Sequence, residues 1–150
     1  MRVVVQRARN ASVTVAGEVV GSFPGLGLVL LVGVTHTDTP TEAAALATRI
    51  YGPRIFEGAE PGEGPREVSA RDGNLPVLVV SQFTLYGDAR KGRRPTWQAA
   101  APGPVSEPVY EAVCAELERL GAHVERGRFG ADMRVESVNG GPITLVLDSP

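Results

Sequence analysis

The segment LPVLVVSQFTL (Leu75–Leu85) contains a nearly continuous apolar run that ends abruptly at Ser81. A short apolar run of this kind, preceded by a proline and rich in β-branched side chains, is typical of a strand buried on both faces. We therefore expect residues 75–85 to form the central strand of a sheet, with polar groups gathered at its end.

Other segments predict strands that flank this one. SVTVAGEVVG (Ser12–Gly21) alternates apolar and polar residues on either side of Ala-Gly-Glu, which indicates a hairpin. GLGLVLLVGV (Gly25–Val34) indicates a second buried strand. Shorter strands are expected at residues 54–56, within residues 123–129 and at residues 143–148.

Two helices complete the predicted fold. Thr39, Pro40 and Glu42 form a helix start with a capping box, and Gly52 ends that helix. The second helix is expected to begin near Ser106 and to stop at Gly121. Apolar residues recur at helical spacing in both segments: Leu46, Ala47 and Ile50 in the first, and Val109, Val113, Leu117 and Leu120 in the second.

Together these elements predict an α/β fold in a single domain over residues 1–150: a mixed, barrel-like sheet with two main helices packed on one side. A chain of 150 residues that is 43% hydrophobic can bury a core of its own. No apolar stretch reaches the roughly 18 residues of a membrane span. Arg7 and Arg9 interrupt the N-terminal apolar run where a signal peptide would continue, and the single cysteine, Cys114, suits a reducing compartment. We expect a cytoplasmic protein with no membrane partner.

The charge is distributed unevenly along the chain. The net charge is only −2, but ARKGRRP (Ala89–Pro95) concentrates four cations in a short loop. These cations are Arg90, Lys91, Arg93 and Arg94. Such a loop can meet a phosphate backbone at one place, or it can simply be solvated.

Ordinary side-chain catalysis is poorly supplied. His36, His123 and Cys114 lack ligand spacing, so we expect neither a metal nor a cofactor. No serine lies in a G-x-S-x-G elbow. Backbone groups and hydroxyls at strand ends remain, in SQFTL (Ser81–Leu85) and in NGGPIT (Asn139–Thr144). Each segment also fits a plain structural role, as a strand end or a turn before a buried strand.

The chain resembles the D-aminoacyl-tRNA deacylases (the D-Tyr-tRNA deacylase family) over nearly its whole length. The matching segments, in family order, are VVVQRARNASVTV, YGPRIF, VLVVSQFTLYGD, KGRRPTW, GRFGADM and VNGGPITLVLD. The chain departs from the family pattern at PREVSA (Pro65–Ala70), and Trp97 stands where phenylalanine is commoner.

The resemblance implies a homodimer that hydrolyses the ester between a D-amino acid and the tRNA 3′ end. In this family the Gly-Pro pair, here Gly141 and Pro142, is cis and reaches into the partner subunit's active site. The two carbonyl oxygens would then collide with an L side chain, while a D side chain and glycine would pass.

The same resemblance implies roles for residues 81–84. The N–H groups of Phe83 and Thr84 would hold the ester carbonyl, and Ser81 and Gln82 would position the terminal adenosine. Either Thr84 attacks as a nucleophile or the 2′-hydroxyl of the terminal ribose assists hydrolysis. We favour the 2′-hydroxyl, because no histidine lies near Thr84 in sequence and Asp88 is the nearest acid.

In this interpretation Arg90, Lys91, Arg93 and Arg94 contact acceptor-stem phosphates of tRNA, and no DNA partner is expected. Two alternatives remain open. One is a non-catalytic RNA-binding module that uses the basic loop and Trp97 as a stacking platform. The other is a small-molecule esterase that uses Thr84 or Ser81.

Overall fold

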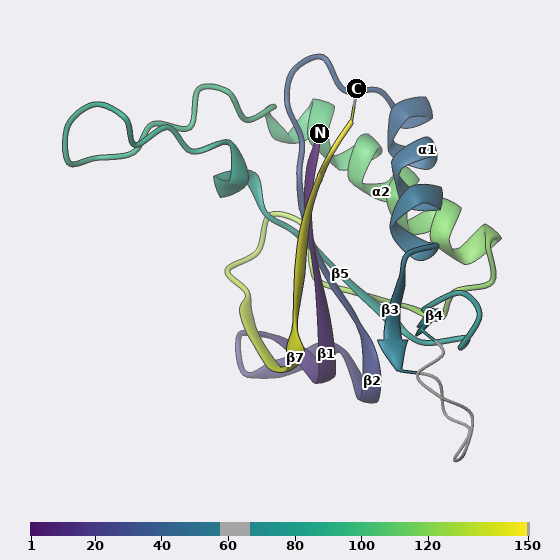
Figure 1. The fold of residues 1–150 in the computed structure, drawn as a ribbon. Coiled ribbons are helices and arrows are strands. Elements are labelled where there is room, and N and C mark those ends of the chain that lie inside the picture. The colour runs from purple at the N-terminus through teal and green to yellow at the C-terminus, as the bar shows by residue number, and fades with distance from the viewer. Residues whose placement is uncertain (58–66, 150) are drawn as a thin grey trace.

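The computed structural model describes residues 1–57 and 67–149, apart from the side chain of Pro142 (Figure 1). A mixed sheet carries both long helices on one face, as the sequence predicted. The elements are β1 (Arg2–Val15), β2 (Glu18–Gly33), α1 (Pro40–Tyr51), β3 (Arg54–Glu57), β4 (Glu67–Ser69), β5 (Val77–Ser81), the 3-10 helix η1 (Phe83–Tyr86), α2 (Gly103–Arg119), β6 (Val124–Arg126) and β7 (Arg134–Asp148).

The main sheet has five strands in the order β6-β5-β2-β1-β7, and β3 pairs with β4 in a small second sheet. β1 is antiparallel to both β2 and β7, whereas β2, β5 and β6 run parallel to one another. The carboxyl ends of β2 and β5 therefore lie at the same edge of the sheet. In open sheets with parallel strands, ligands commonly bind at such an edge.

Burial on both faces explains the apolar run of β5. Val77 and Val79 pack towards α1 and α2, in the main core. Leu78 and Val80 belong to a second cluster on the opposite face, together with Val13 and other residues of the β1–β2 hairpin. All four side chains are buried because the sheet is covered on both sides.

The second cluster forms because the alternation of inward and outward side chains along β1 shifts by one residue. Val3 and Val5 face the helices, but Ala11 and Val13 face the other way, after a register shift between Ala8 and Asn10. A bulge of this kind bends a strand. The hairpin half of the sheet thus packs in the opposite core.

Both helices begin and end close to the positions predicted from the sequence. In α1 the Thr39–Glu42 capping box is present and Gly52 is the C-cap. α2 begins at Gly103, three residues before the predicted Ser106, because Pro104 occupies the first turn, where a missing N–H costs nothing. Gly121, with φ +91°, follows the end of α2 as predicted.

Three predicted strands have different bounds. The central strand ends at Ser81 and the chain then turns into η1, so residues 83–85 are not in a strand. The predicted segments 18–21 and 25–34 belong to one continuous strand, β2, which ends at Gly33 and so leaves Val34 outside it. β7 begins at Arg134, so Asn139–Pro142 lie within it and do not precede it, and Val146 is 61% exposed where we expected a buried strand.

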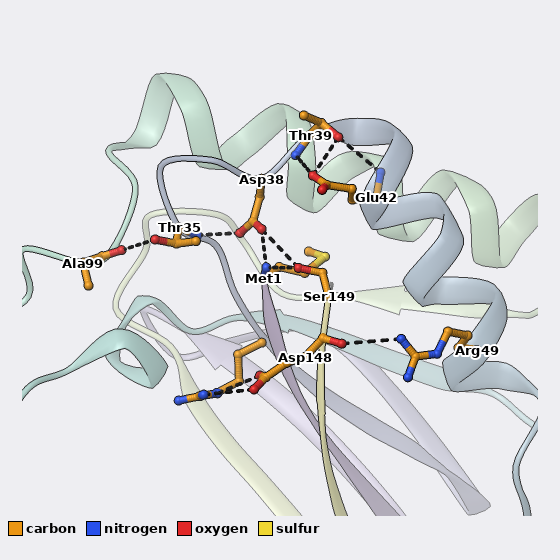
Figure 2. A network of polar contacts seen from close by, with 10 residues as sticks. Met1, Thr35, Asp38, Thr39, Glu42, Arg49, Ala99, Asp148 and Ser149 are labelled. Atoms are coloured by element: carbon orange, nitrogen blue, oxygen red, sulfur yellow. Dashed lines mark hydrogen bonds and ion pairs between the residues drawn. The ribbon is translucent and has the colours of Figure 1, made fainter.

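The loop between β2 and α1 is fixed by a polar network (Figure 2). The carboxylate of Asp38 accepts hydrogen bonds from the Met1 amine and from the backbone N–H of Thr35, the latter at 2.6 Å. Thr35 Oγ1 in turn donates to the Ala99 carbonyl at 2.6 Å. The network thereby anchors the segment that leads into α2.

Within the described residues, no helix is both long enough and apolar enough to cross a membrane.

Candidate active site

A cavity of about 390 Å³ opens at the carboxyl ends of β2 and β5. Val32 and Val80 supply apolar walls from these two strands, and Val34 adds another just after β2. The rest of the lining comes from the end of β5 and the residues after it, from the first half of α2 and the residues before it, and from the β6–β7 loop and the start of β7. Its size and its mostly apolar lining suit a small organic group such as a nucleobase.

Ser81, Gln82 and Phe83 form one rim of this cavity. The Gln82 N–H continues the sheet by donating to the Val32 carbonyl at 2.7 Å. At Phe83 the chain turns into η1, and the first N–H groups of a helix have no partner inside the helix. Among the described residues, the N–H groups of Phe83 and Thr84 make no hydrogen bond. They are therefore available to an oxygen of a bound molecule.

Thr84 is exposed and, unlike its three neighbours, does not line the cavity. Its hydroxyl accepts a hydrogen bond from the Gln82 side-chain amide. Asp88, the nearest acid in sequence, is held by two hydrogen bonds from the Arg90 guanidinium, at 2.9 and 2.7 Å. Hydrogen bonding to Arg90 lowers the pKa of Asp88 to about 2. A carboxylate with so low a pKa is a poor general base for a hydroxyl.

Two aromatic rings line the cavity and were not assigned a role from the sequence. Tyr110 on α2 and Phe129 on the β6–β7 loop lie 5.8 Å apart between ring centroids. The Tyr110 hydroxyl donates to the Val79 carbonyl at 3.0 Å, so the side chain offers its ring to the cavity. Burial also raises the pKa of Tyr110. Phe129 belongs to GRFGADM, so the family motif was the only signal that pointed to it.

Gly140 and Gly141 lie in a wide bulge of β7. Gln6 pairs with Thr144 and Ala8 pairs with Asn139, so residues 140–143 stand opposite Arg7 alone. The Arg7 guanidinium fills the bulge. Its Nε donates to the Gly140 carbonyl at 2.7 Å, its Nη2 to the Gly141 carbonyl at 3.2 Å, and its Nη1 to the Ile55 carbonyl at 2.6 Å.

The close approach of Arg7 requires glycine at position 141. A Cβ atom there would lie 1.8 Å from Nη2 of Arg7, and φ is +137°. Within its own chain Gly141 does not line the cavity, so this structure does not bring it together with Ser81, Gln82 and Phe83. The side chain of Pro142 lies outside the described residues. The cis bond between Gly141 and Pro142 stays a prediction.

The four predicted phosphate contacts lie in the loop that extends away from the body of the fold after η1 (Figure 1). A β-bridge closes the loop at its base, where Asp88 and Thr96 exchange two backbone hydrogen bonds of 2.9 Å. All four cations are exposed: Arg90, Lys91, Arg93 and Arg94. η1 lies between the cavity and the loop, because Phe83 lines the cavity and the loop follows Tyr86.

Within the described part of the chain, no three potential ligand side chains gather into a metal site. His36 is exposed and contacts the Gln98 carbonyl through Nε2 at 2.9 Å. His123 is exposed and pairs with Glu125. Cys114 is fully buried, and burial raises the pKa of its thiol to about 11. None of the three is poised for chemistry at the cavity.

Comparisons with known proteins agree with the motifs. The profile of the family described as D-Tyr-tRNA(Tyr) deacylase matches residues 4–148. A D-aminoacyl-tRNA deacylase of Thermobifida fusca is 58% identical and covers 99% of both chains. A solved structure titled c-Myc DNA Unwinding Element Binding Protein is 35% identical with a TM-score of 0.88, and the match covers 100% of this chain and 99% of that one.

A second structure, of a probable eukaryotic D-amino acid tRNA deacylase, has a TM-score of 0.83 at 17% identity and covers 97% of each chain. Identity this low supports the fold alone. The profile match and the identity to curated relatives extend over almost the entire chain. This chain therefore belongs to the D-Tyr-tRNA(Tyr) deacylase family, a family of hydrolases that act on an ester bond.

Proposed function

We propose that this chain hydrolyses the ester of D-aminoacyl-tRNA and releases a free D-amino acid and tRNA. The proposal is supported by two neighbouring N–H groups without partners, at Phe83 on the cavity rim and at Thr84 directly after it, beside a pocket lined by Tyr110 and Phe129. The terminal adenine occupies the cavity, against the wall that Tyr110 and Phe129 line together, with Ser81 and Gln82 positioning the adenosine. The ester carbonyl then lies against the N–H groups of Phe83 and Thr84.

The reaction needs little more than these groups. Water adds to the ester carbonyl carbon, and the N–H groups stabilise the oxyanion that forms, a kind of contact whose loss costs about 100- to 1,000-fold in rate. The bond to the 3′-oxygen then breaks, and that oxygen takes up a proton. The neighbouring 2′-hydroxyl assists the proton transfer. The two nearby protein groups are already engaged, because the Thr84 hydroxyl is hydrogen-bonded to Gln82 and the Asp88 carboxylate to Arg90.

Selection against L-aminoacyl-tRNA belongs to Gly141 and Pro142, acting in trans within a homodimer. Arg7 fixes the carbonyls of Gly140 and Gly141, and a rigid wall can reject a substrate by collision. Gly141 lies on an edge strand and is exposed, so it is accessible to a second copy. A glycyl group has no side chain to collide, so mischarged glycyl-tRNA is a second substrate.

We place the reaction in the cytoplasm, where charged tRNA is found. The basic loop contacts acceptor-stem phosphates without reading bases. The 35%-identical structure is titled for a DNA element, so a DNA duplex and a DNA single strand belong among the competitors in any binding assay.

Release of amino acid from D-Tyr-tRNA and L-Tyr-tRNA, measured side by side, tests the proposal. Rapid cleavage of the D ester alone supports the reaction and the filter. Equal cleavage of both esters, or cleavage of simple esters without RNA, would make the protein an unselective esterase. Binding of tRNA without turnover would make it a binding module.

A further inference from the structure

Phe83 and Trp97 form an exposed aromatic pair at the mouth of the cavity. Their ring centroids are 5.6 Å apart and the rings meet edge to face at 79°. Phe83 is 56% exposed and Trp97 is 43% exposed, which is unusual for two large apolar side chains in contact. An exposed aromatic surface of this kind is typical of a binding site.

The indole of Trp97 is held in place. It packs on Gly87, where an added Cβ would lie 2.5 Å from Cζ3 of the indole. The residues on either side are fixed as well, because the Asp88–Thr96 bridge precedes Trp97 and the Ala100 N–H donates to the Trp97 carbonyl at 3.0 Å. A ring that is already ordered loses little entropy when a ligand stacks on it.

The pair lies between two regions that already have proposed ligands. Phe83 lines the cavity assigned to the terminal adenosine, and Trp97 directly follows the loop assigned to phosphates. A strand that leaves the cavity towards the basic loop must therefore pass over the pair. In tRNA that strand is the unpaired 3′ end.

We propose that the Phe83–Trp97 pair stacks on the unpaired nucleobase immediately 5′ of the terminal adenosine. The inference rests on the proposed function and identifies the part of the substrate that this surface binds. Every base has a π-face, so stacking of this kind tolerates any sequence and complements the backbone contacts of a basic loop. The flanking cations favour a polyanion over a second copy of the chain, whose own basic loop would be repelled.

Trp97 is the only tryptophan in the sequence, so its fluorescence reports on this surface alone. The probe is an uncharged RNA hairpin with an unpaired ACCA end, compared with the same hairpin carrying an abasic ribose at the second-last position. We expect the intact hairpin to quench Trp97 fluorescence and the abasic hairpin to bind with little quenching. Equal fluorescence changes with both hairpins would overturn the inference.

Kinetics with D-Tyr-charged hairpins supply the second test. Loss of one stacked base corresponds to a factor of about 5 to 150, so Trp97→Ala should raise KM by that factor with little change in kcat. Trp97→Phe should recover most of the affinity. Val19→Ala removes another exposed apolar side chain, in the β1–β2 hairpin, and serves as the matched control.

A double-mutant cycle makes the result specific. If Trp97 stacks on the second-last base, the abasic change should raise KM for the wild type but not for Trp97→Ala. Independent effects of the two changes on KM would overturn the inference. A change in the oligomeric mass of Trp97→Ala in sedimentation would also overturn it, because the aromatic pair would then be an interface between copies. Failure of the wild type to hydrolyse D-Tyr-tRNA would refute the proposed function instead, and the quenching experiment with uncharged RNA would still decide the stacking.

Discussion

Arg7 holds the backbone of Gly140, with Nε of the guanidinium 2.7 Å from the glycine carbonyl oxygen. The same guanidinium reaches the carbonyls of Gly141 and Ile55, so one side chain of β1 binds the backbone of two residues of β7 and one residue of β3. The backbone around the proposed filter against L-amino acids is therefore held in place by a planar cation. This arrangement gives the first prediction.

Arg7→Lys should weaken rejection of L-Tyr-tRNA, because an ammonium cannot reproduce the planar fork that reaches three carbonyls. The unfolding free energy should fall by about 2 kcal/mol, since a hydrogen bond to a charged group contributes about 1.5–3 kcal/mol. The measurement is the ratio of kcat/KM for D- and L-Tyr-tRNA, with exposed Arg134→Lys as the control. An unchanged ratio would show that Arg7 does not support the filter.

Gly141→Ala should be more harmful than Gly121→Ala. Both glycines have positive φ, at +137° and +91°, so both substitutions carry a backbone cost of roughly 1–2 kcal/mol. An added Cβ at Gly121 meets nothing within 4 Å, whereas at Gly141 it meets Arg7. We expect Gly141→Ala to lose a further 1–3 kcal/mol or so of stability and to lose selectivity; chemical denaturation of both variants provides the check. Equal losses would mean that Arg7 moves aside freely.

Thr84→Ala should keep most of the deacylase activity, because the Thr84 hydroxyl lies outside the cavity and has no free base beside it. Replacement of the terminal adenosine by its 2′-deoxy form should reduce the rate much more. Single-turnover rates with both substrates measure the two effects. Complete loss of activity in a folded Thr84→Ala protein, together with a trapped acyl-enzyme in the wild type, would identify Thr84 as the nucleophile.

Neutralising Lys91, Arg93 and Arg94 to glutamine should weaken tRNA binding and flatten its salt dependence. Each lost phosphate contact lowers the slope of log K against log salt by about 0.7–0.9. Arg119→Gln, an exposed change on α2, should leave the slope as it is. If the triple variant kept the wild-type salt slope, the loop would be merely solvated and would not contact phosphates.

Stability should fall between pH 9 and pH 11 because of Cys114. The pKa of this thiol is raised by burial to about 11, so in this range the folded thiol keeps its proton while the unfolded thiol loses it. The unfolded state then binds fewer protons, and the free energy of unfolding decreases as the pH rises. Cys114→Ala should make the dependence shallower in urea titrations at pH 8, 9.5 and 11. If the unfolding free energy of Cys114→Ala fell with pH as steeply as that of the wild type, other groups would cause the loss of stability at alkaline pH.

Local signals predicted much of this fold. The capping box of α1, the glycine after α2 and the apolar run of β5 each act within a few residues, and the structure has all three. The bulge of β7 had no such signal, because it depends on Arg7, which lies far away in the sequence. Asn-Gly-Gly-Pro therefore suggested a turn before a strand, whereas the chain forms a widened strand around a guanidinium.

Local sequence signals predicted only part of the candidate site as well. The polar end of the apolar run indicated residues 81–84, but the turn into η1, which frees two N–H groups, follows from tertiary contacts with β2. Tyr110 and Phe129 line the cavity side by side, although they come from segments that share no local pattern. Such pairs become visible only when the chain is folded.

The bulge of β7 also bears on how the protein avoids aggregation. β7 spans 15 residues at an open sheet edge, and long unpaired edges are templates for strand addition by other chains. Residues 140–143 depart from regular pairing near its middle, so the edge is divided into two shorter runs that no single incoming strand can pair with continuously. The backbone distortion that presents Gly141 thus also guards the sheet against polymerisation.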